Sequence, residues 1–172
     1  MVRVMAVGIF DLLHAGHLHY VEQAKSLGHE LVVVIAHDET VRMQKHEPVT
    51  GQNLRRRMVE GLKPVDRAII GNPPGIPIFD ILETVKPDII ALGYDQKHSI
   101  DAIRNGLEEH DYGHVQVTRV EGLSDDLDGT RNGADDFLVK YGREALIEVL
   151  AIARESHNKS KKFNWEGEPK LS

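Results

Sequence analysis

The sequence predicts an α/β fold, a Rossmann-like open parallel sheet with helices on both faces and strand order 3-2-1-4-5. Short apolar runs alternate with segments of helical spacing through most of the chain. One run, Leu31–Ile35, is apolar and β-branched throughout, which is typical of a buried parallel strand. Crossovers between parallel strands are right-handed. An open sheet of this kind binds ligands beyond the carboxyl ends of its strands, where the strand order reverses.

Five strands are predicted from the apolar runs. The first two and the fourth are mostly apolar. The third ends at the turn-rich run Gly71–Gly75. The fifth alternates apolar and polar residues, which favours an edge position. In chain order, the predicted strands are Val2–Val7, Leu31–Ile35, Arg67–Ile70, Asp88–Leu92 and Val115–Val120.

Four helices are predicted between these strands. The first places Leu18, Val21 and Ala24 on one face and is closed by Gly28. The second is stopped by Pro64. In chain order, the predicted helices are Leu18–Leu27, Gln52–Leu62, Ile78–Val85 and Asp101–Glu109.

The domain organisation follows from where this alternation ends. We expect residues 1–133 to form the α/β core, with no internal repeat or low-complexity linker. Residues 134–155 carry apolar side chains at helical spacing and predict a helical extension, packed on the core or on a partner chain. We expect a homodimer. Residues 156–172 have little periodicity and are expected to form a mobile tail.

Composition excludes several classes of protein. The 172 residues contain no Cys, which excludes disulfides, Cys-ligated zinc, iron–sulfur clusters and thiol catalysis. A net charge of −6 argues against general binding to nucleic acid or to a membrane surface. No apolar run is long enough to span a bilayer and no signal peptide opens the sequence, so we expect a cytoplasmic protein.

The most informative motif is His14-Ala15-Gly16-His17, which follows the first predicted strand and the turn Gly8-Ile9-Phe10-Asp11. Two imidazoles three residues apart at the start of a helix lie on the same face. The helix N-terminus adds unpaired N–H groups and a partial positive charge. Gly16 allows a bulky anion to approach the backbone. Together these features predict a phosphate-transfer site.

Two other interpretations of these histidines are open. His14, His17 and His19 could bind a metal, because imidazole is a common ligand, although no carboxylate follows at the HExxH spacing. They could also be surface residues of a helix with no role in function.

The run Gly8–His17 resembles the GTFDxxHxGH signature of the cytidylyltransferase-like nucleotidyltransferases. Three further segments, Ala36–Arg42, Met58–Asp66 and Leu92–Gln96, resemble the archaeal FAD synthase branch of that family. Glycerol-3-phosphate cytidylyltransferases are its near relatives. The resemblance extends from about residue 2 to about residue 124, and its motifs are specific in combination.

The resemblance implies roles for several cations and one carboxylate. His14 and His17 become the principal catalytic pair, donating to the α- and β-phosphate oxygens. The family places a phosphate-binding lysine after the second strand, which is Lys45 here, with Arg42 as its competitor and a solvated loop lysine as the alternative. Mg²⁺ or another divalent cation is expected to bridge the phosphates with few protein ligands. Asp11 is the nearest carboxylate that could orient the metal, and a turn or helix-capping role is its alternative.

The nucleotide is expected between two sequence-distant turns. The turn Gly8, Ile9, Phe10 and Asp11 follows the first strand, and Gly93, Asp95 and Gln96 follow the fourth, which is its neighbour in the predicted order. Short polar side chains at this position can read a base edge or a ribose. The aromatic residues available to stack an isoalloxazine are Phe10, Tyr94 and Tyr112. Of Arg55, Arg56 and Arg57, at most two can face the site, because successive helical residues point in different directions.

The segment after the fifth strand departs from the family pattern. Arg119–Ser124 resembles the RTEGIS segment, whose arginine assists the phosphates, and Ser124 is expected at the nucleotide. The relatives continue directly with Ser or Thr at a helix start, whereas this chain has Asp125, Asp126 and Asp128 first. Either Thr130 is the shifted hydroxyl, with Arg131 beside it, or this phosphate cradle is remodelled.

The resemblance implies transfer of the adenylyl group of ATP to FMN, yielding FAD and pyrophosphate. One alternative is CTP-dependent cytidylyl transfer to glycerol phosphate or a similar alcohol phosphate. The other is a catalytically weak nucleotide-binding regulatory protein, which the altered segment after Ser124 would allow.

Overall fold

The computed structural model describes residues 1–44, 47–77 and 79–122, all of which belong to one unit, Met1–Thr130. Their centre is a five-stranded parallel sheet in the order β3-β2-β1-β4-β5. This is the predicted order, so the strand order reverses between β1 and β4. The strands are β1 (Arg3–Gly8), β2 (Glu30–Ile35), β3 (Arg67–Ile70), β4 (Ile89–Leu92) and β5 (Gln116–Arg119).

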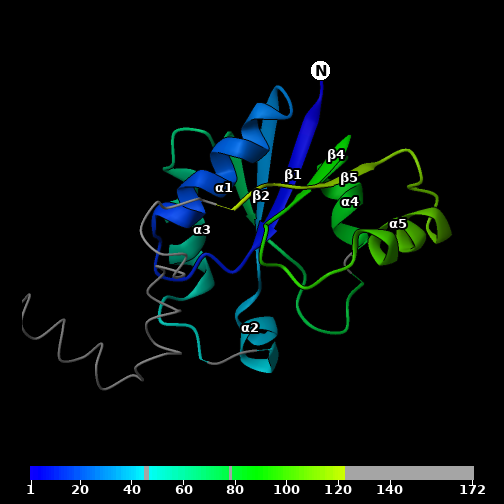
Figure 1. The fold of residues 1–172 in the computed structure, drawn as a ribbon. Helices are drawn as coiled ribbons and strands as arrows, with labels where there is room; N and C mark the ends of the chain where they lie inside the picture. The colour runs from blue at the N-terminus through cyan, green and yellow to red at the C-terminus, as the bar shows by residue number, and fades with distance from the viewer. Residues whose placement is uncertain (45–46, 78, 123–172) are drawn as a thin grey trace, which may run out of the picture. The chain divides into compact units, whose positions relative to one another are not determined.

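Helices cover both faces of the sheet, as predicted (Figure 1). Their bounds are α1 (Ala15–Ser26), α2 (Asp38–Gln44), α3 (Gln52–Glu60), α4 (Asp80–Val85) and α5 (Ile100–Glu109). Tyr20 of α1 and Val59 of α3 pack in one apolar cluster, whereas Leu82 of α4 and Leu107 of α5 pack in the other. The α1 and α3 layer therefore lies across the sheet from the α4 and α5 layer.

Alternation along the strands divides the core between these two layers. On β1, Val4 and Ala6 pack beneath α1, while Met5 belongs to the cluster under α4 and α5. On β2, Val33 and Val32 divide in the same way. Successive strand side chains point to opposite faces, so a sheet covered on both sides must be apolar throughout. The uninterrupted apolar run of β2 reflects this double burial.

The helix α2 is the element that the sequence pattern does not predict. Val41 is the buried residue of this short helix, so its segment shows no apolar periodicity. Asp38 and Glu39 lie in its first turn, where negative charge is favourable. Arg42, the competitor of Lys45 for the phosphate, lies on α2 and forms an ion pair with Glu47 at 2.7 Å.

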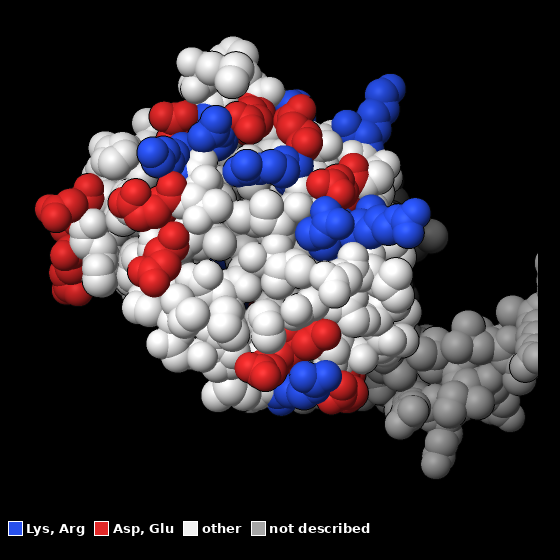
Figure 2. Space-filling view, turned by 180° about the vertical axis from the view of Figure 1, so that it is seen from behind, with Lys and Arg blue, Asp and Glu red and all other residues white. Residues whose placement is uncertain are grey.

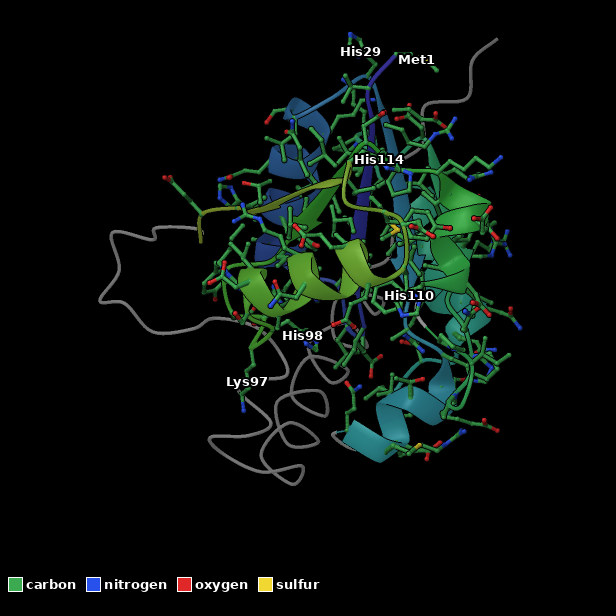
Figure 3. The ribbon with its side chains drawn as sticks, turned by 90° about the vertical axis from the view of Figure 1, so that its right-hand side faces the viewer. Met1, His29, Lys97, His98, His110 and His114 are labelled. Atoms are coloured by element: carbon green, nitrogen blue, oxygen red, sulfur yellow. The ribbon has the colours of Figure 1, made fainter. Side chains whose placement is uncertain are left out.

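Different polar side chains lie at the two ends of the sheet. Met1, His29 and His114 lie toward one end, and Lys97 and His98 extend from the other (Figure 3). Lys97 and His98 follow β4, so they mark the carboxyl end of the strands. On the face seen in Figure 2, basic side chains do not gather into one continuous patch. No helix among the described residues is long and apolar enough to cross a membrane.

Candidate active site

The turn between β1 and α1 has an unusual backbone. Phe10 and Leu12 have positive φ angles, 54° and 49°, a region that side-chain-bearing residues rarely adopt. Phe10 is only 1% exposed, so its ring is part of the core. A Cβ atom at Gly8 would lie 2.7 Å from Cε2 of Phe10. Gly8 is therefore required by the folded-back Phe10 ring, and Phe10 cannot stack on a substrate as the sequence suggested.

The motif histidines lie together at the start of α1. His14 is the N-cap residue, and its Nδ1 accepts a hydrogen bond from the Gly16 N–H at 3.1 Å. The ring centroids of His14 and His17 are 3.9 Å apart. Because Nδ1 of His14 is an acceptor, the neutral ring carries its proton on Nε2. The local structure thus makes Nε2 of His14 a hydrogen-bond donor.

Gly16 leaves room for the His14 ring, and the approach of an anion to its backbone stays a prediction. A Cβ at Gly16 would lie 3.0 Å from Cε1 and 3.1 Å from Nδ1 of His14. The Gly16 N–H is bonded to the His14 ring, and the His17 N–H to the His14 carbonyl at 3.1 Å. The expectation of unpaired N–H groups at this helix start is therefore wrong for these two residues. The predicted donation to a phosphate is therefore assigned to the two side chains, and the positive end of the helix favours an anion beside them.

Asp11 joins this turn to the loop before α3. Its Oδ2 accepts from the Val49 N–H at 2.6 Å, and its Oδ1 accepts from the Thr50 N–H at 3.0 Å and the Thr50 hydroxyl at 2.5 Å. Asp11 is 7% exposed. This geometry corresponds to the turn role that the sequence left open for Asp11. The metal-orienting role stays a prediction.

Arg55 is the cation that this side of the turn depends on. Its side chain is fully buried, and its guanidinium donates to the carbonyls of Ile9, Ala36 and Thr50 at 2.5, 2.9 and 2.9 Å. It also forms an ion pair with Asp38 at 2.6 Å. Desolvation acts to raise the pKa of Asp38, but hydrogen bonds from Arg55 and the backbone of Gln52, together with the charge of Arg55, hold that pKa below its ordinary value. One arginine thus joins four segments.

The sequence did not identify which of the three consecutive arginines would be buried. Arg55 is four residues before Val59, which is also buried, so the two share a helical face. The spacing of four residues between Arg55 and the apolar Val59 was the feature of the sequence that could have identified the buried arginine. Arg56 instead pairs with Glu60 at 2.6 Å on the surface, and Arg57 is exposed.

The turn after β4 lies beside the turn after β1, as predicted. Ala6 pairs with Ala91, and Nε2 of Gln96 donates to the Val7 carbonyl at 2.6 Å. Oε1 of Gln96 accepts from the Gly93 N–H at 3.2 Å. The Gln96 amide therefore connects the ends of β1 and β4. Asp95 is exposed at this end of the strand.

Arg119 holds the same turn from β5. Its guanidinium donates to the carbonyls of Gly93 and Gln96 at 2.7 Å each and to the His98 carbonyl at 2.6 Å. The sequence assigned Arg119 to the phosphates. The structure gives it contacts that shape the segment after β4, and any phosphate contact stays a prediction.

The hydroxyl of Tyr20 bridges β1 and β4 from the α1 side of the sheet. It donates to the Ala91 carbonyl at 2.8 Å and accepts from the Val7 N–H at 3.2 Å. Burial raises the pKa of this phenol above its ordinary value, so the group remains a donor at neutral pH. Sequence reasoning placed Tyr20 on a helix without a role.

The remaining aromatic candidates differ in exposure. The hydrogen bond of Tyr112 to Glu83 is the main cause that raises the pKa of this phenol to about 12. Tyr112 thus belongs to the α4 and α5 layer. Tyr94, which is 47% exposed, directly follows Gly93 at the end of β4. Tyr94 is the most exposed of the three predicted stacking residues, and its stacking on a substrate stays a prediction.

Several predicted features lie outside the described residues. These are Lys45, Ser124, Thr130 and Arg131, the acidic residues Asp125, Asp126 and Asp128, the extension 134–155 and the tail 156–172. A cavity of about 490 Å³ is lined by α5 and β5, including Arg104, Leu107 and Gln116, and its lining contains no residue of the His14–His17 motif.

Comparison with known proteins agrees with this geometry. The model of the cytidylyltransferase-like family matches residues 5–121. The FAD synthase of Aciduliprofundum boonei is 48% identical over 132 residues, covering 76% of this chain and 87% of that protein. The FAD synthase of Thermococcus onnurineus is 49% identical over 110 residues, covering 63% and 73%.

Solved structures show the same fold. The lipopolysaccharide core biosynthesis protein of Thermoplasma volcanium has a TM-score of 0.68 and 41% identity, covering 72% of this chain and 99% of that one. Pantoate-beta-alanine ligase of Francisella tularensis has a TM-score of 0.51 at 13% identity, covering 73% and 60%, and shares the fold alone. With two histidines at the head of α1 and adjoining turns at the strand reversal, the chain belongs to the cytidylyltransferase-like family and is a nucleotidyltransferase.

Proposed function

We propose that this nucleotidyltransferase is an FAD synthase, which transfers the adenylyl group of ATP to FMN. The observation that carries the proposal is the identity of 48% to the FAD synthase of A. boonei, along 76% of the chain. The FAD synthase of T. onnurineus is 49% identical to this chain over 110 residues. A homodimer in the cytoplasm stays a prediction from the sequence.

The reaction requires positioning more than proton transfer. An oxygen of the FMN phosphate attacks the α-phosphorus of ATP. The bond from that phosphorus to the α–β bridging oxygen breaks, and pyrophosphate leaves with the oxygen. The FMN phosphate is ionised near neutral pH, so the attack needs no general base. Catalysis then depends on alignment of the phosphates and stabilisation of the charge that develops on them.

His14 and His17 are suited to that stabilisation. Nε2 of His14 is a donor because Nδ1 accepts from the Gly16 N–H. The imidazole of His17 lies against it. In the proposed mechanism both rings donate to oxygens of the α- and β-phosphates. Their bonds strengthen as charge moves toward the departing pyrophosphate.

A divalent cation is compatible with the described residues. Three hydrogen bonds occupy much of the Asp11 carboxylate, which leaves capacity for one more partner. The described part of the chain contains no cluster of three His, Asp or Glu residues arranged to hold a metal. Mg²⁺ needs few protein ligands when substrate phosphates and water complete its shell. Asp11 is the proposed protein ligand, and the cation would neutralise phosphate charge.

The substrate assignment is tested by a matrix of two nucleotides and two acceptors. ATP or CTP is combined with FMN or glycerol phosphate in the presence of Mg²⁺, and pyrophosphate release is measured. We expect release with ATP and FMN, together with the loss of flavin fluorescence that accompanies FAD formation. Turnover of CTP with glycerol phosphate and no FAD would contradict the proposal. Pyrophosphate in none of the four mixtures would favour a regulatory nucleotide-binding protein.

The histidine roles are tested separately. We expect His14→Ala and His17→Ala each to lower kcat by about 100-fold or more, because each removes a donor to transition-state charge. His19→Ala is the matched control: its ring contacts Gln23 on the same helix, at 2.6 Å. Near-normal turnover in either motif variant, or an equal loss in the control, would refute the assignment.

A further inference from the structure

Four aromatic rings follow one another from the sheet to the candidate catalytic pair. Tyr20 and Phe10 stack with centroids 6.0 Å apart and planes 9° from parallel. Phe10 and His17 are 5.2 Å apart with planes at 41°, and His17 lies 3.9 Å from His14. We call Tyr20, Phe10, His17 and His14 the ring series. It begins in the core and ends at the motif.

The middle of the ring series has little freedom to move. Phe10 is 1% exposed, and its backbone is in the left-handed region, at φ 54°. Such a conformation is strained for a residue with a side chain and persists only where the surroundings impose it. Gly8 allows the ring to approach the backbone, since a Cβ there would lie 2.7 Å from Cε2 of Phe10. The strained backbone and close packing together fix where this ring lies.

The inner end of the ring series is anchored to the sheet. The hydroxyl of Tyr20 donates to the Ala91 carbonyl of β4 at 2.8 Å and accepts from the Val7 N–H of β1 at 3.2 Å. These are adjacent strands at the point where the strand order reverses. The ring series therefore connects His17 to β1 and β4, the two strands beside the site, through packed side chains.

The helix backbone does not by itself fix the ring plane of His17. The torsion between Cβ and the imidazole is broad and roughly two-fold, so both nitrogens can exchange places by rotation. Contact with Phe10 restricts that rotation. The Phe10 side chain is buried and contributes no polar atom, so it can act on the reaction only through its neighbours.

We propose that Phe10, backed by Tyr20, is a positioning residue for nucleotidyl transfer that sets the ring plane of His17. The inference rests on the proposed function in one respect, the catalytic role of His17. It assigns to the phenylalanine of the first turn a task other than contact with the nucleotide.

The first test measures ring geometry without activity. In the wild-type protein we expect nuclear Overhauser contacts between the Phe10 and His17 rings, with the His17 signal assigned from a His17→Gln variant. Phe10→Leu should shift and broaden the Cε1–H signal of His17. Gly8→Ala should have the same effect while leaving every ring chemically intact, because the new Cβ displaces Phe10.

The second test measures the reaction in the same variants. Phe10→Leu and Gly8→Ala should each lower kcat for ATP and FMN by roughly 10- to 100-fold, the range expected from misplacing a reacting group by up to about 1 Å. KM for ATP should change much less, since the Phe10 side chain is buried in the core. Thermal unfolding establishes that the measured protein is folded, and rates are expressed per folded molecule.

A second phenylalanine and histidine pair supplies the matched control. Phe79 stacks on His110 with centroids 4.1 Å apart and planes at 20°, in the α4 and α5 layer across the sheet. Phe79→Leu is the same substitution against the same kind of ring. It should shift the signal of His110, leave that of His17 in place, and keep kcat within about twofold.

The outcomes separate this inference from the proposed function. Absence of ring contacts between Phe10 and His17 in the wild type overturns the inference whether or not Phe10→Leu folds. A displaced His17 signal with unchanged kcat also overturns it. An equal fall of kcat in Phe79→Leu would show that the effect is general destabilisation. If His17→Ala is itself active, the catalytic role of His17 is refuted, and the positioning role of Phe10 is refuted with it, even if the ring contacts are observed.

Discussion

Replacing Arg55 with Met tests whether one buried guanidinium holds the turn after β1. Methionine has similar length and helix propensity, so the change removes the charge and the donors with little effect on α3 itself. It leaves the carbonyls of Ile9, Ala36 and Thr50 without their donor and Asp38 without its cation.

The magnitude follows from burial. Arg55 is fully buried, while the side chain of Asp38 is 20% exposed and can recover some hydration. Removing one partner of a buried ion pair destabilises a protein by about 3–5 kcal/mol. For a chain of this size, each kcal/mol lowers Tm by roughly 2–4 °C, so we expect Tm to fall by about 6–20 °C. Because Ile9 and Thr50, which bonds to Asp11, lose their donor, kcat should also fall in the folded fraction.

Urea unfolding followed by circular dichroism measures the free energy of unfolding. The control is Arg56→Met, the adjacent residue of the same helix, whose pair with Glu60 lies on the surface. A change within about 0.5 kcal/mol is expected there. Similar losses of unfolding free energy in both variants would refute the reasoning, because the buried ion pair would then contribute no more than the surface pair.

Two further predictions concern Gly16 and Asp66. Gly16→Ala should lower kcat by about tenfold or more, since the new Cβ would lie 3.0 Å from the His14 ring, while alanine leaves Tm equal or higher; unchanged kcat would contradict this account. Desolvation acts to raise the pKa of Asp66, but hydrogen bonds from Lys25 and the Leu31 N–H lower it overall. A lowered folded-state pKa means that the stabilisation is present above the unfolded pKa and is lost as pH falls through the folded value. Acid unfolding curves should therefore be shallower in Asp66→Asn than in the wild type, and parallel curves would count against the ion pair.

The sheet was predictable from the sequence because its pattern is local. Strands such as Leu31–Ile35 are buried on both faces, so burial appears directly as an apolar run. The helix α2 was not predictable in this way, since Val41 alone gives no periodicity. The strand order 3-2-1-4-5 came from the Rossmann-like fold class as a whole, because right-handed crossovers are compatible with that order but do not by themselves determine it.

The site was predictable only where the functional residues are close together in the sequence. His14 and His17 are three positions apart, and their proximity follows from helical geometry. The role of Arg55 depends on carbonyls at Ile9 and Ala36, which no residue type encodes. The positive φ of Phe10 likewise arises from tertiary packing, and the sequence presented that ring as available to a substrate.

The clamp of Asp11 on Val49 and Thr50 also has a consequence for motion. These loop amides donate to a buried carboxylate, and the Thr50 carbonyl accepts from Arg55. Opening the loop would expose a paired buried cation, so its amides should exchange hydrogen almost as slowly as those of the central strands. The side of the site formed by the turn after β1 and the loop before α3 is therefore ordered when the chain folds, and substrate binding does not have to order it again.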